Sequence, residues 1–311
     1  MKIIAIVLII LILLYLLLTY FMFVLISKKS TNNILPMSKA VTKALEPYAK
    51  QIEKGNKWIE DKYKKNEVKD IYITSNDNLK LHAILIEPKN SKGIIIETHG
   101  YRSVASRDLY PSCFNYYDMG YSLLIVDNRA SNLSEGKYIT FGIRESEDII
   151  NWVKYVNKTF PKQDIILAGI SMGASSILMS LKDVTKKMNI KYVIADCGYI
   201  SAYEEVLYCI KRFFHLNGKL FIGMIDIWCK LIAKFSLKEK DTISSLSKAK
   251  IPILFIHGTD DDFVPTINSK RNYEQYNGPK ELVLFEKTTH GLSYLVDSKK
   301  YIKSIKEFIN K

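Results

Sequence analysis

Cysteine is scarce in this chain of 311 residues, and its four cysteines form no CxxC pair. They lie at Cys113, Cys197, Cys209 and Cys229, and no histidine is spaced to complete a zinc site with them. Four cysteines in a chain of this length do not form a disulfide framework. We therefore expect free, buried thiols, with neither a metal nor an organic cofactor.

Glycine and proline are also few, at 14 and 8 residues, and no repeat of about 20–50 residues is visible. These shortages exclude collagen-like, low-complexity and solenoid chains. Hydrophobic residues make up 48% of the chain and charged residues 25%, which is the balance of a globular protein. The length suits two domains or one large α/β domain.

The net charge of +13 comes mostly from lysine and is concentrated in residues 27–70, 197–250 and 297–311. These segments lack the aromatic interleaving of proteins that bind single-stranded nucleic acid. The charge therefore favours a surface near an anionic membrane, with no nucleic-acid partner.

A long apolar segment predicts a transmembrane anchor over residues 1–26. Between residues 3 and 26, Thr19 is the only residue outside the hydrophobic set. A helix of this length extends about 36 Å, enough to cross a hydrocarbon core of about 30 Å. The alternative is a cleaved signal peptide, but such peptides end in small residues, and this segment stays bulky up to the lysines that follow it.

Lysines flank the predicted span unequally. Only Lys2 precedes it, and four lysines follow it closely, namely Lys28, Lys29, Lys39 and Lys43. The positive-inside rule thus favours a single-pass membrane protein whose bulk faces the cytoplasm. A short basic N-terminus that stays inside as a signal anchor is the alternative orientation. Residues 27–67 are polar and rich in lysine, include Trp58 and Tyr63, and predict a basic helical spacer packed on the main domain.

From residue 68 onward the pattern predicts an α/β domain. Two alternating segments, 68–74 and 79–86, predict a β-hairpin. Six short apolar segments then alternate with helical patterns, at 94–98, 122–127, 164–170, 192–196, 251–256 and 282–285. Such segments are typical of parallel strands buried on both faces, so we expect an eight-stranded, doubly wound sheet. Active sites in such sheets lie beyond the carboxyl ends of the strands.

The clearest motif is GISMG at residues 169–173, between a predicted strand and a predicted helix. G-x-S-x-G in this position is typical of a nucleophile elbow, a tight turn that exposes a serine, here Ser171. The two glycines are expected because side chains there would clash with the neighbouring strand and helix. The alternative is a glycine-rich turn with an incidental serine.

A serine nucleophile needs a base and an acid that orients it, in the chain order serine, acid, histidine. Three histidines follow Ser171. His290 lies in a loop between the last strand and the last helix and is the expected base. We expect His257, at a strand end, to be structural and His215 to lie on the surface or in packing.

Three successive aspartates, Asp260, Asp261 and Asp262, follow a strand end between the serine and His290. Because three adjacent carboxylates repel one another, at most one of them is expected to be buried.

With these features, residues 68–311 resemble the α/β-hydrolase superfamily, in particular bacterial membrane-anchored serine hydrolases related to dienelactone hydrolase and acylaminoacyl-peptidase-like domains. The matching motifs are His99-Gly100-Tyr101, Asp127-Asn128-Arg129, the elbow, His257-Gly258-x-x-Asp261-x-x-Val264-Pro265 and His290-Gly291. The resemblance implies that the acid is Asp261, with Asp260 and Asp196 as alternatives. It also implies an oxyanion hole formed by the backbone N–H groups of Tyr101 and Met172, unless Tyr101 is a plain loop residue. The family's glycine after Asp-x-Arg is displaced here to Gly136.

An insertion at about 197–250 is too long for a simple crossover and predicts two helices, near 202–216 and 219–236. The second helix is apolar nearly all round, which is typical of buried core. The functional alternative is a lid over the serine whose inner face binds an apolar acyl group, with basic residues that attract an anionic head group or lipid surface.

These features predict a membrane-tethered serine hydrolase that cleaves a carboxylic ester or thioester, small or lipid-like, through an acyl-enzyme. An acylaminoacyl-type peptidase would use the same residues. The alternative from a different functional class is a non-catalytic module for interactions at the membrane.

Overall fold

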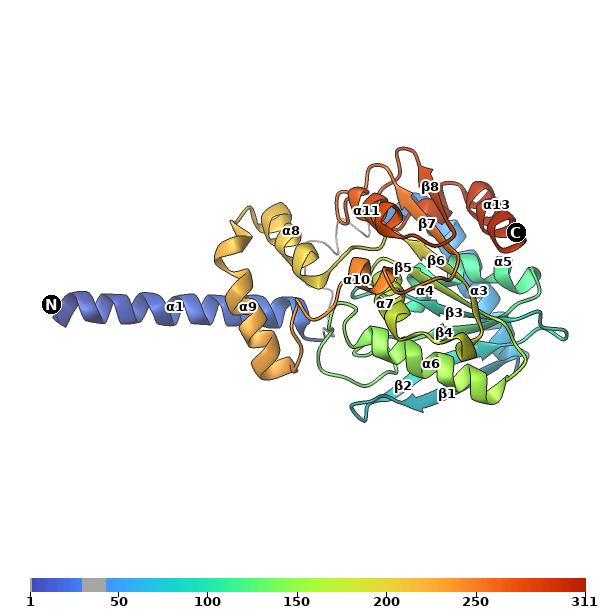
Figure 1. Ribbon diagram of the computed structural model, residues 1–311, viewed down its shortest axis with the longest axis horizontal. Helices are drawn as coiled ribbons and strands as arrows, with labels where there is room; N and C mark the ends of the chain where they lie inside the picture. Colours follow the sequence, from blue (N-terminus) through green and yellow to red (C-terminus); the bar gives the residue numbers. More distant parts are fainter. Residues whose placement is uncertain (1, 30–42) are drawn as a thin grey trace.

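The computed structural model describes residues 2–29 and 43–311 (Figure 1). Residues 30–42, in the predicted spacer, lie outside the described residues, and Lys39 is one of them. The later part of that spacer forms helix α3 (Ala49–Lys64), which packs against the main domain through Ile59 and Trp58.

The centre of the molecule is an eight-stranded sheet in the order β1-β2-β4-β3-β5-β6-β7-β8. The strands are β1 (Val68–Thr74), β2 (Lys80–Ile86), β3 (Ile94–Thr98), β4 (Ser122–Val126), β5 (Ile165–Ile170), β6 (Ile190–Asp196), β7 (Ile253–Gly258) and β8 (Lys280–Phe285). Strand β2 pairs antiparallel with both β1 and β4, and every other pair is parallel. The mostly parallel sheet predicted from the apolar segments is therefore confirmed.

Helices cover both faces of the sheet, which explains why its central strands are apolar without alternation. One face packs on α6 (Glu145–Thr159) and α7 (Met172–Ser180), and the other packs on α3, α5 (Tyr110–Asp118) and α13 (Ser298–Ile309). Trp152 on α6 and Tyr116 on α5 are among the large buried aromatics of the two layers. The two cores hold the strand ends rigidly, and the loops beyond those ends carry the candidate site.

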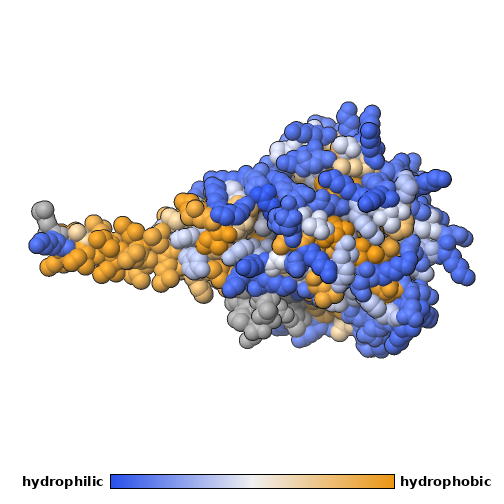
Figure 2. All heavy atoms as spheres, turned by 90° about the horizontal axis from the view of Figure 1, so that it is seen from below, coloured by the Kyte–Doolittle hydropathy of each residue, from blue (hydrophilic) through white to orange (hydrophobic). Residues whose placement is uncertain are grey.

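Helix α1 (Lys2–Ser27) projects from the domain, and the insertion lies against its base (Figure 1). By length and composition, α1 is able to cross a membrane. The first predicted insertion helix is α8 (Ala202–Phe214). The second is broken into a 3₁₀ turn (Gly218–Leu220), α9 (Ile222–Trp228) and a π-helical turn (Cys229–Ala233), which ends at Lys234 in a left-handed conformation. Figure 2 shows the apolar surface of α1 continuing onto the part of the domain where it enters.

The four cysteines are free thiols. Cys113, Cys197 and Cys229 are buried, whereas Cys209 is half-buried.

Candidate active site

The elbow serine lies in a strained turn between β5 and α7. Ser171 has φ +55° and ψ −121°, and it is 4% exposed. A Cβ at Gly169 would approach the Gly173 backbone carbon to 2.6 Å, and one at Gly173 would approach the Thr98 carbonyl oxygen to 2.3 Å. Both glycines are thus required by close backbone approach, and the turn holds the serine side chain at the carboxyl end of the sheet.

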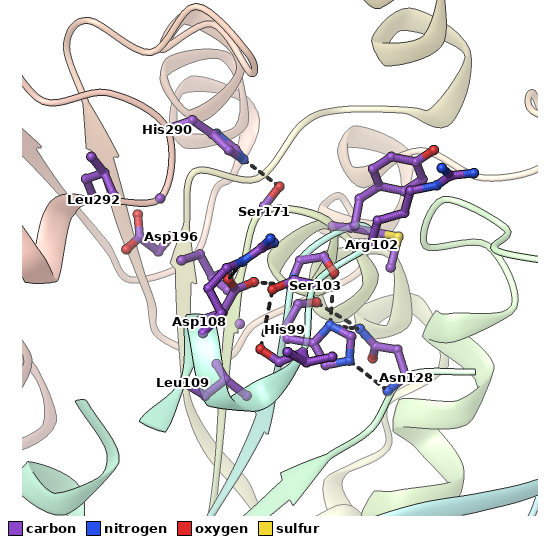
Figure 3. Close-up of a pocket in the computed structure, with 18 of the residues that line it drawn as sticks. His99, Arg102, Ser103, Asp108, Leu109, Asn128, Ser171, Asp196, His290 and Leu292 are labelled. Atoms are coloured by element: carbon purple, nitrogen blue, oxygen red, sulfur yellow. Dashed lines mark hydrogen bonds and ion pairs between the residues drawn. The ribbon is translucent and has the colours of Figure 1, made fainter. Parts of the chain in front are cut away.

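Three side chains from separate loops meet at this turn. The Ser171 Oγ lies 2.8 Å from His290 Nε2 (Figure 3). The other ring nitrogen, Nδ1, lies 2.7 Å from Asp261 Oδ2. The structure thus brings the predicted serine, base and acid into one hydrogen-bonded chain, with Asp261 after β7 and His290 after β8.

Asp261 is held by a second set of donors on its other side. Its Oδ1 accepts hydrogen bonds from the backbone N–H groups of Phe263 and Val264, at 3.0 and 2.8 Å. His257 lies 3.1 Å from Oδ2 through its Nε2. Burial disfavours the Asp261 carboxylate, but the charge of His290 and the hydrogen bonds from His257 and His290 outweigh it and hold the pKa of Asp261 well below the usual range.

His257 is buried, as expected of a structural residue, but it also has a specific position in the site. Its Nδ1 lies 2.7 Å from Ser269 Oγ, and its Nε2 faces the Val264 carbonyl as well as Asp261. Both neighbours of Nε2 are acceptors, so the proton belongs on Nε2 and Nδ1 accepts from the serine hydroxyl. His257 therefore fixes the acid in place. From the sequence, His257 was predicted only as a structural residue at the end of a strand.

The other acids considered from the sequence point elsewhere. Asp260 is exposed and accepts from the Thr259 hydroxyl, and Asp262 pairs with Arg212 at 2.6 Å. Asp196 is buried, and its Oδ1 accepts from Ser293 Oγ at 3.3 Å. Of the four candidates, Asp261 is the one in hydrogen-bond contact with the His290 imidazole. Burial opposes protonation of that imidazole, but the Asp261 carboxylate outweighs it and raises the pKa of His290 well above its ordinary value.

The loop after β3 passes directly beside the serine. A Cβ at Gly100 would lie 3.2 Å from the Ser171 Cβ. Both Tyr101 and Met172, predicted to supply oxyanion N–H groups, line the same cavity as the serine. The site is therefore arranged so that two loops flank the nucleophile.

His99 braces this loop through the backbone (Figure 3). Its Nδ1 lies 2.9 Å from the Gly100 carbonyl oxygen, and its Nε2 accepts from the Asn128 N–H at 3.2 Å. The Gly100 N–H donates to Asp108 Oδ2 at 2.9 Å. The Gly100 carbonyl and the Tyr101 N–H belong to one trans peptide and point in opposite directions, so the His99 bond also sets the direction of the Tyr101 N–H.

The side chains of this loop bind the end of the apolar helix, a contact that no local motif predicts. The Tyr101 hydroxyl donates to the Ile26 carbonyl at 2.6 Å. The Arg102 guanidinium donates to the carbonyls of Leu25 and Lys28, at 2.5 and 3.1 Å. The last carbonyls of a helix lack intrahelical partners, and here the loop beside the serine satisfies them.

A cavity of about 540 Å³ opens beside the serine. Its lining includes Arg212 and Phe213 from α8, together with Leu45 and Lys29. Among the described residues, none of those that line the cavity belongs to helix α9. The second insertion helix therefore follows the buried-core expectation, and its alternative role as an acyl-binding lid finds no support in the cavity lining.

Helix α9 packs on helix α1 instead. Ile222 and Ile225 lie in one apolar cluster with Met22 and Phe23. Sequence periodicity indicated that this helix has an apolar partner, but it carries no information about which partner that is.

The inner end of the cavity carries two buried acids, Glu97 on β3 and Asp196 on β6. Glu97 pairs with Ala168 and Asp196 with Ile170 of β5, so both acids lie on one face of the sheet below the serine. Burial raises the pKa of Glu97 to about 8 and that of Asp196 to about 6. Asp196 was considered from the sequence as an alternative triad acid, whereas Glu97 was not predicted as part of the site, because an isolated acid in an apolar strand has no motif.

One cluster has the composition of a metal site, with Cys197, Asp261 and His290 offering ligand atoms within 4.8 Å of one another. Burial raises the pKa of the Cys197 thiol to about 12, so it stays protonated, and thiols bind metals as thiolates. The other two side chains already bond to each other. The donor set therefore fits a hydrogen-bonded triad better than a metal.

The chain is similar to known proteins. Residues 46–227 match the family described as X-Pro dipeptidyl-peptidase (S15 family). The uncharacterized protein YqkD of Bacillus subtilis is 30% identical over 227 residues, which is 72% of this chain and 73% of YqkD.

Two solved structures are also similar. The esterase Pf2001 of Pyrococcus furiosus superposes with a TM-score of 0.63 at 26% identity, covering 78% of this chain and 92% of that one. An acylaminoacyl peptidase superposes with a TM-score of 0.56 at 20% identity, covering 78% of this chain and 41% of that one.

Proposed function

The chain belongs to the X-Pro dipeptidyl-peptidase (S15) family. From the geometry of its site, we propose that it is a membrane-tethered serine hydrolase that cleaves a carboxylic ester or thioester through an acyl-enzyme. Its resemblance to the α/β hydrolases and its assignment as a serine hydrolase are confirmed by these comparisons. The observation that carries the proposed mechanism is the hydrogen-bonded chain from Ser171 through His290 to Asp261.

In the proposed reaction, Ser171 Oγ attacks the carbonyl carbon while its proton passes to His290 Nε2. The Asp261 carboxylate stabilises the imidazolium that forms. The bond from carbon to the leaving oxygen or sulfur then breaks, and His290 returns the proton to the leaving alcohol or thiol. Water repeats the sequence on the acyl-enzyme, releasing the acid and restoring the serine.

The negative charge that develops on the carbonyl oxygen is proposed to be stabilised by the backbone N–H groups of Tyr101 and Met172. The location of Gly100 beside the serine supports this role, as does the His99 bond that orients the Tyr101 peptide. Loss of one such donor typically costs about 2.7–4 kcal/mol of transition-state stabilisation.

Tethering is proposed to occur through α1 as a single span, with the hydrolase domain on the cytoplasmic face. Support comes from the apolar length of the helix and from the lysines that follow it. The bonds from Tyr101 and Arg102 to the end of α1 argue against its removal as a signal peptide. Small esters and lipid-like esters are both substrate candidates, since the cavity is large enough for a medium acyl group.

Peptide bond cleavage is the second candidate, favoured by the S15 family match. The same three residues would act, with an amine as the leaving group. A non-catalytic membrane module is disfavoured because such a module has no need for an aligned serine, histidine and aspartate.

The test uses the full chain in detergent micelles with a fluorophosphonate probe, followed by a panel of p-nitrophenyl esters and peptide anilides. We expect labelling of the wild type and ester hydrolysis faster than anilide hydrolysis. Labelling that survives Ser171→Ala would refute the assigned nucleophile, and faster anilide cleavage would favour the peptidase.

A further inference from the structure

Helix α1 is divided into a bare half and a half that packs against the domain. Residues 2–14 are exposed along their whole length, whereas Thr19 is fully buried. The Trp228 indole N–H donates to Thr19 Oγ1 at 3.1 Å, and the Tyr15 hydroxyl donates to the Leu220 carbonyl at 2.7 Å. The insertion therefore contacts α1 from Tyr15 onward, where α9 crosses it (Figure 1).

The bare half of α1 is too short to span a membrane by itself. Thirteen helical residues extend about 20 Å, and a hydrocarbon core of about 30 Å needs about 20 residues. A span that begins at Ile3 reaches about as far as Met22. Tyr15 then lies about 10 Å inside the hydrocarbon boundary, and the part of the insertion that contacts it lies at a similar depth.

The outward side of α9 and its flanking turns is suited to that depth. Leu220, Gly223, Ile227 and Leu231 follow a helical spacing of three and four residues. The three large side chains are 64%, 43% and 60% exposed, and a Cβ at Gly223 would meet no atom within 4 Å. Figure 2 shows apolar surface continuing from α1 onto the adjoining part of the domain, and α9 contacts α1.

Aromatic and basic residues border the stripe. Tyr20 and Trp228 pack edge to face, with ring centroids 5.5 Å apart, and aromatic residues of this kind concentrate at membrane interfaces. Exposed lysines surround the insertion at Lys211, Lys219, Lys230 and Lys234. Apolar residues at the centre with lysines around them are typical of a helix that lies in the interface of an anionic membrane.

We propose that the α8–α9 insertion is a second membrane contact, with the stripe Leu220–Gly223–Ile227–Leu231 immersed in the lipid interface beside α1. This inference rests on the proposed membrane tethering. It places the side of the cavity that is lined by Arg212 and Phe213 of α8 near the lipid surface. An ester would then reach the serine from the membrane without crossing bulk water.

The direct test measures depth in the full chain reconstituted into phosphatidylcholine and phosphatidylglycerol vesicles. An environment-sensitive fluorophore is attached to Leu231→Cys, in a Cys209→Ala background that removes the half-buried thiol. Tyr63→Cys on α3, away from α1 in Figure 1, is the matched control with 44% exposure. We expect nitroxide-labelled acyl chains to quench the Leu231 label at least threefold more than the control label.

Equal quenching at the two sites would overturn the proposal. So would a Leu231 label that is shielded by a second copy of the chain instead of by lipid. The depth measurement does not depend on hydrolysis, so it separates this inference from the proposed activity. A second arm compares Leu231→Asp with Tyr63→Asp. We expect Leu231→Asp alone to lower hydrolysis of a vesicle-borne ester about tenfold, while both variants hydrolyse a short soluble ester at wild-type rates. An equal loss on the two esters would overturn the interfacial role of the stripe.

Discussion

At the scale of single residues, the choice of acid depends on which of three adjacent aspartates turns inward. The backbone N–H groups of Phe263 and Val264 face the Asp261 side chain and select it. Its neighbours point outward, with Asp262 bound to Arg212 on the surface.

We predict that Asp261→Asn lowers kcat by about 10⁴-fold, because the histidine loses the carboxylate that fixes its tautomer and stabilises its charge. Asp260→Asn and Asp262→Asn are the matched controls and are expected to stay within about threefold of the wild type. Steady-state kinetics on a p-nitrophenyl ester would check this. A crippled Asp260→Asn enzyme with a nearly normal Asp261→Asn enzyme would contradict it.

The buried acid Glu97, at the inner end of the cavity, should make the free energy of unfolding depend on pH. Burial raises its folded-state pKa to about 8, so the folded protein holds a proton that the unfolded chain releases near its ordinary pKa of 4.5. The protonated Glu97 side chain therefore makes its whole contribution to the stability of the fold below pH 4.5, and this contribution is lost as the pH rises toward 8.

We predict that Glu97→Gln stabilises the fold relative to the wild type by up to about 5 kcal/mol at pH 9 and has little effect at pH 5. Urea unfolding of the full chain in detergent at the two pH values measures the difference. Glu274→Gln, at an exposed position on α11 (Ile267–Gln275), is the control and should show no such trend. A constant offset for Glu97→Gln would contradict the shifted pKa.

At the scale of elements, the sequence was sufficient to predict the structure of segments that are buried on both sides by the sheet and its helices. The strands and the elbow were predictable because a run of Ile and Val, or a glycine pair around a serine, has few alternative structures. The partner of α9 was not predictable, since an apolar face does not specify what it packs against. The bond from Tyr101 to Ile26 joins residues 75 positions apart and leaves no local pattern.

The elbow itself can be tested by adding one methyl group. We predict that Gly173→Ala prevents correct folding or abolishes activity, because the new Cβ would lie 2.3 Å from the Thr98 carbonyl oxygen. Gly223→Ala on α9 is the control, where the Cβ meets open space, and it should gain up to about 1 kcal/mol from helix propensity. Thermal unfolding and fluorophosphonate labelling would measure both. A Gly173→Ala enzyme with normal labelling would refute the close approach.

In the loop after β3, the proposed oxyanion role of the Tyr101 backbone and the contact of the Tyr101 side chain with α1 can be tested separately. We predict that Tyr101→Phe lowers stability by about 1 kcal/mol, because the Ile26 carbonyl loses its donor. Its kcat should stay within about threefold, because the proposed oxyanion donor is the backbone N–H. A fall in kcat above 100-fold at unchanged melting temperature would instead indicate that the hydroxyl takes part in catalysis.

At the scale of the whole molecule, helix α1 and the hydrolase domain form one folded unit. Phe23 is fully buried, and the cluster around it draws residues from α1, α8 and α9. The Ile139 N–H also donates to the Ser27 carbonyl at 2.7 Å, which ties the end of α1 to the loop before α6. Removal of α1 would therefore remove part of the core as well as the proposed membrane attachment.

Two truncations distinguish these roles. We predict that a chain starting at Tyr15, which loses the bare half of α1, keeps its melting temperature and its labelling rate while it loses stable membrane insertion. A chain starting at Lys43 lacks the docked half as well, so it exposes the cluster around Phe23 and leaves the side chains of Tyr101 and Arg102 without their carbonyl partners. Since the loss of one large buried aromatic costs about 3–5 kcal/mol, this chain should melt many degrees lower and react with fluorophosphonate at least tenfold more slowly. Equal melting temperatures and labelling rates for the two truncations would mean that α1 is a simple tether.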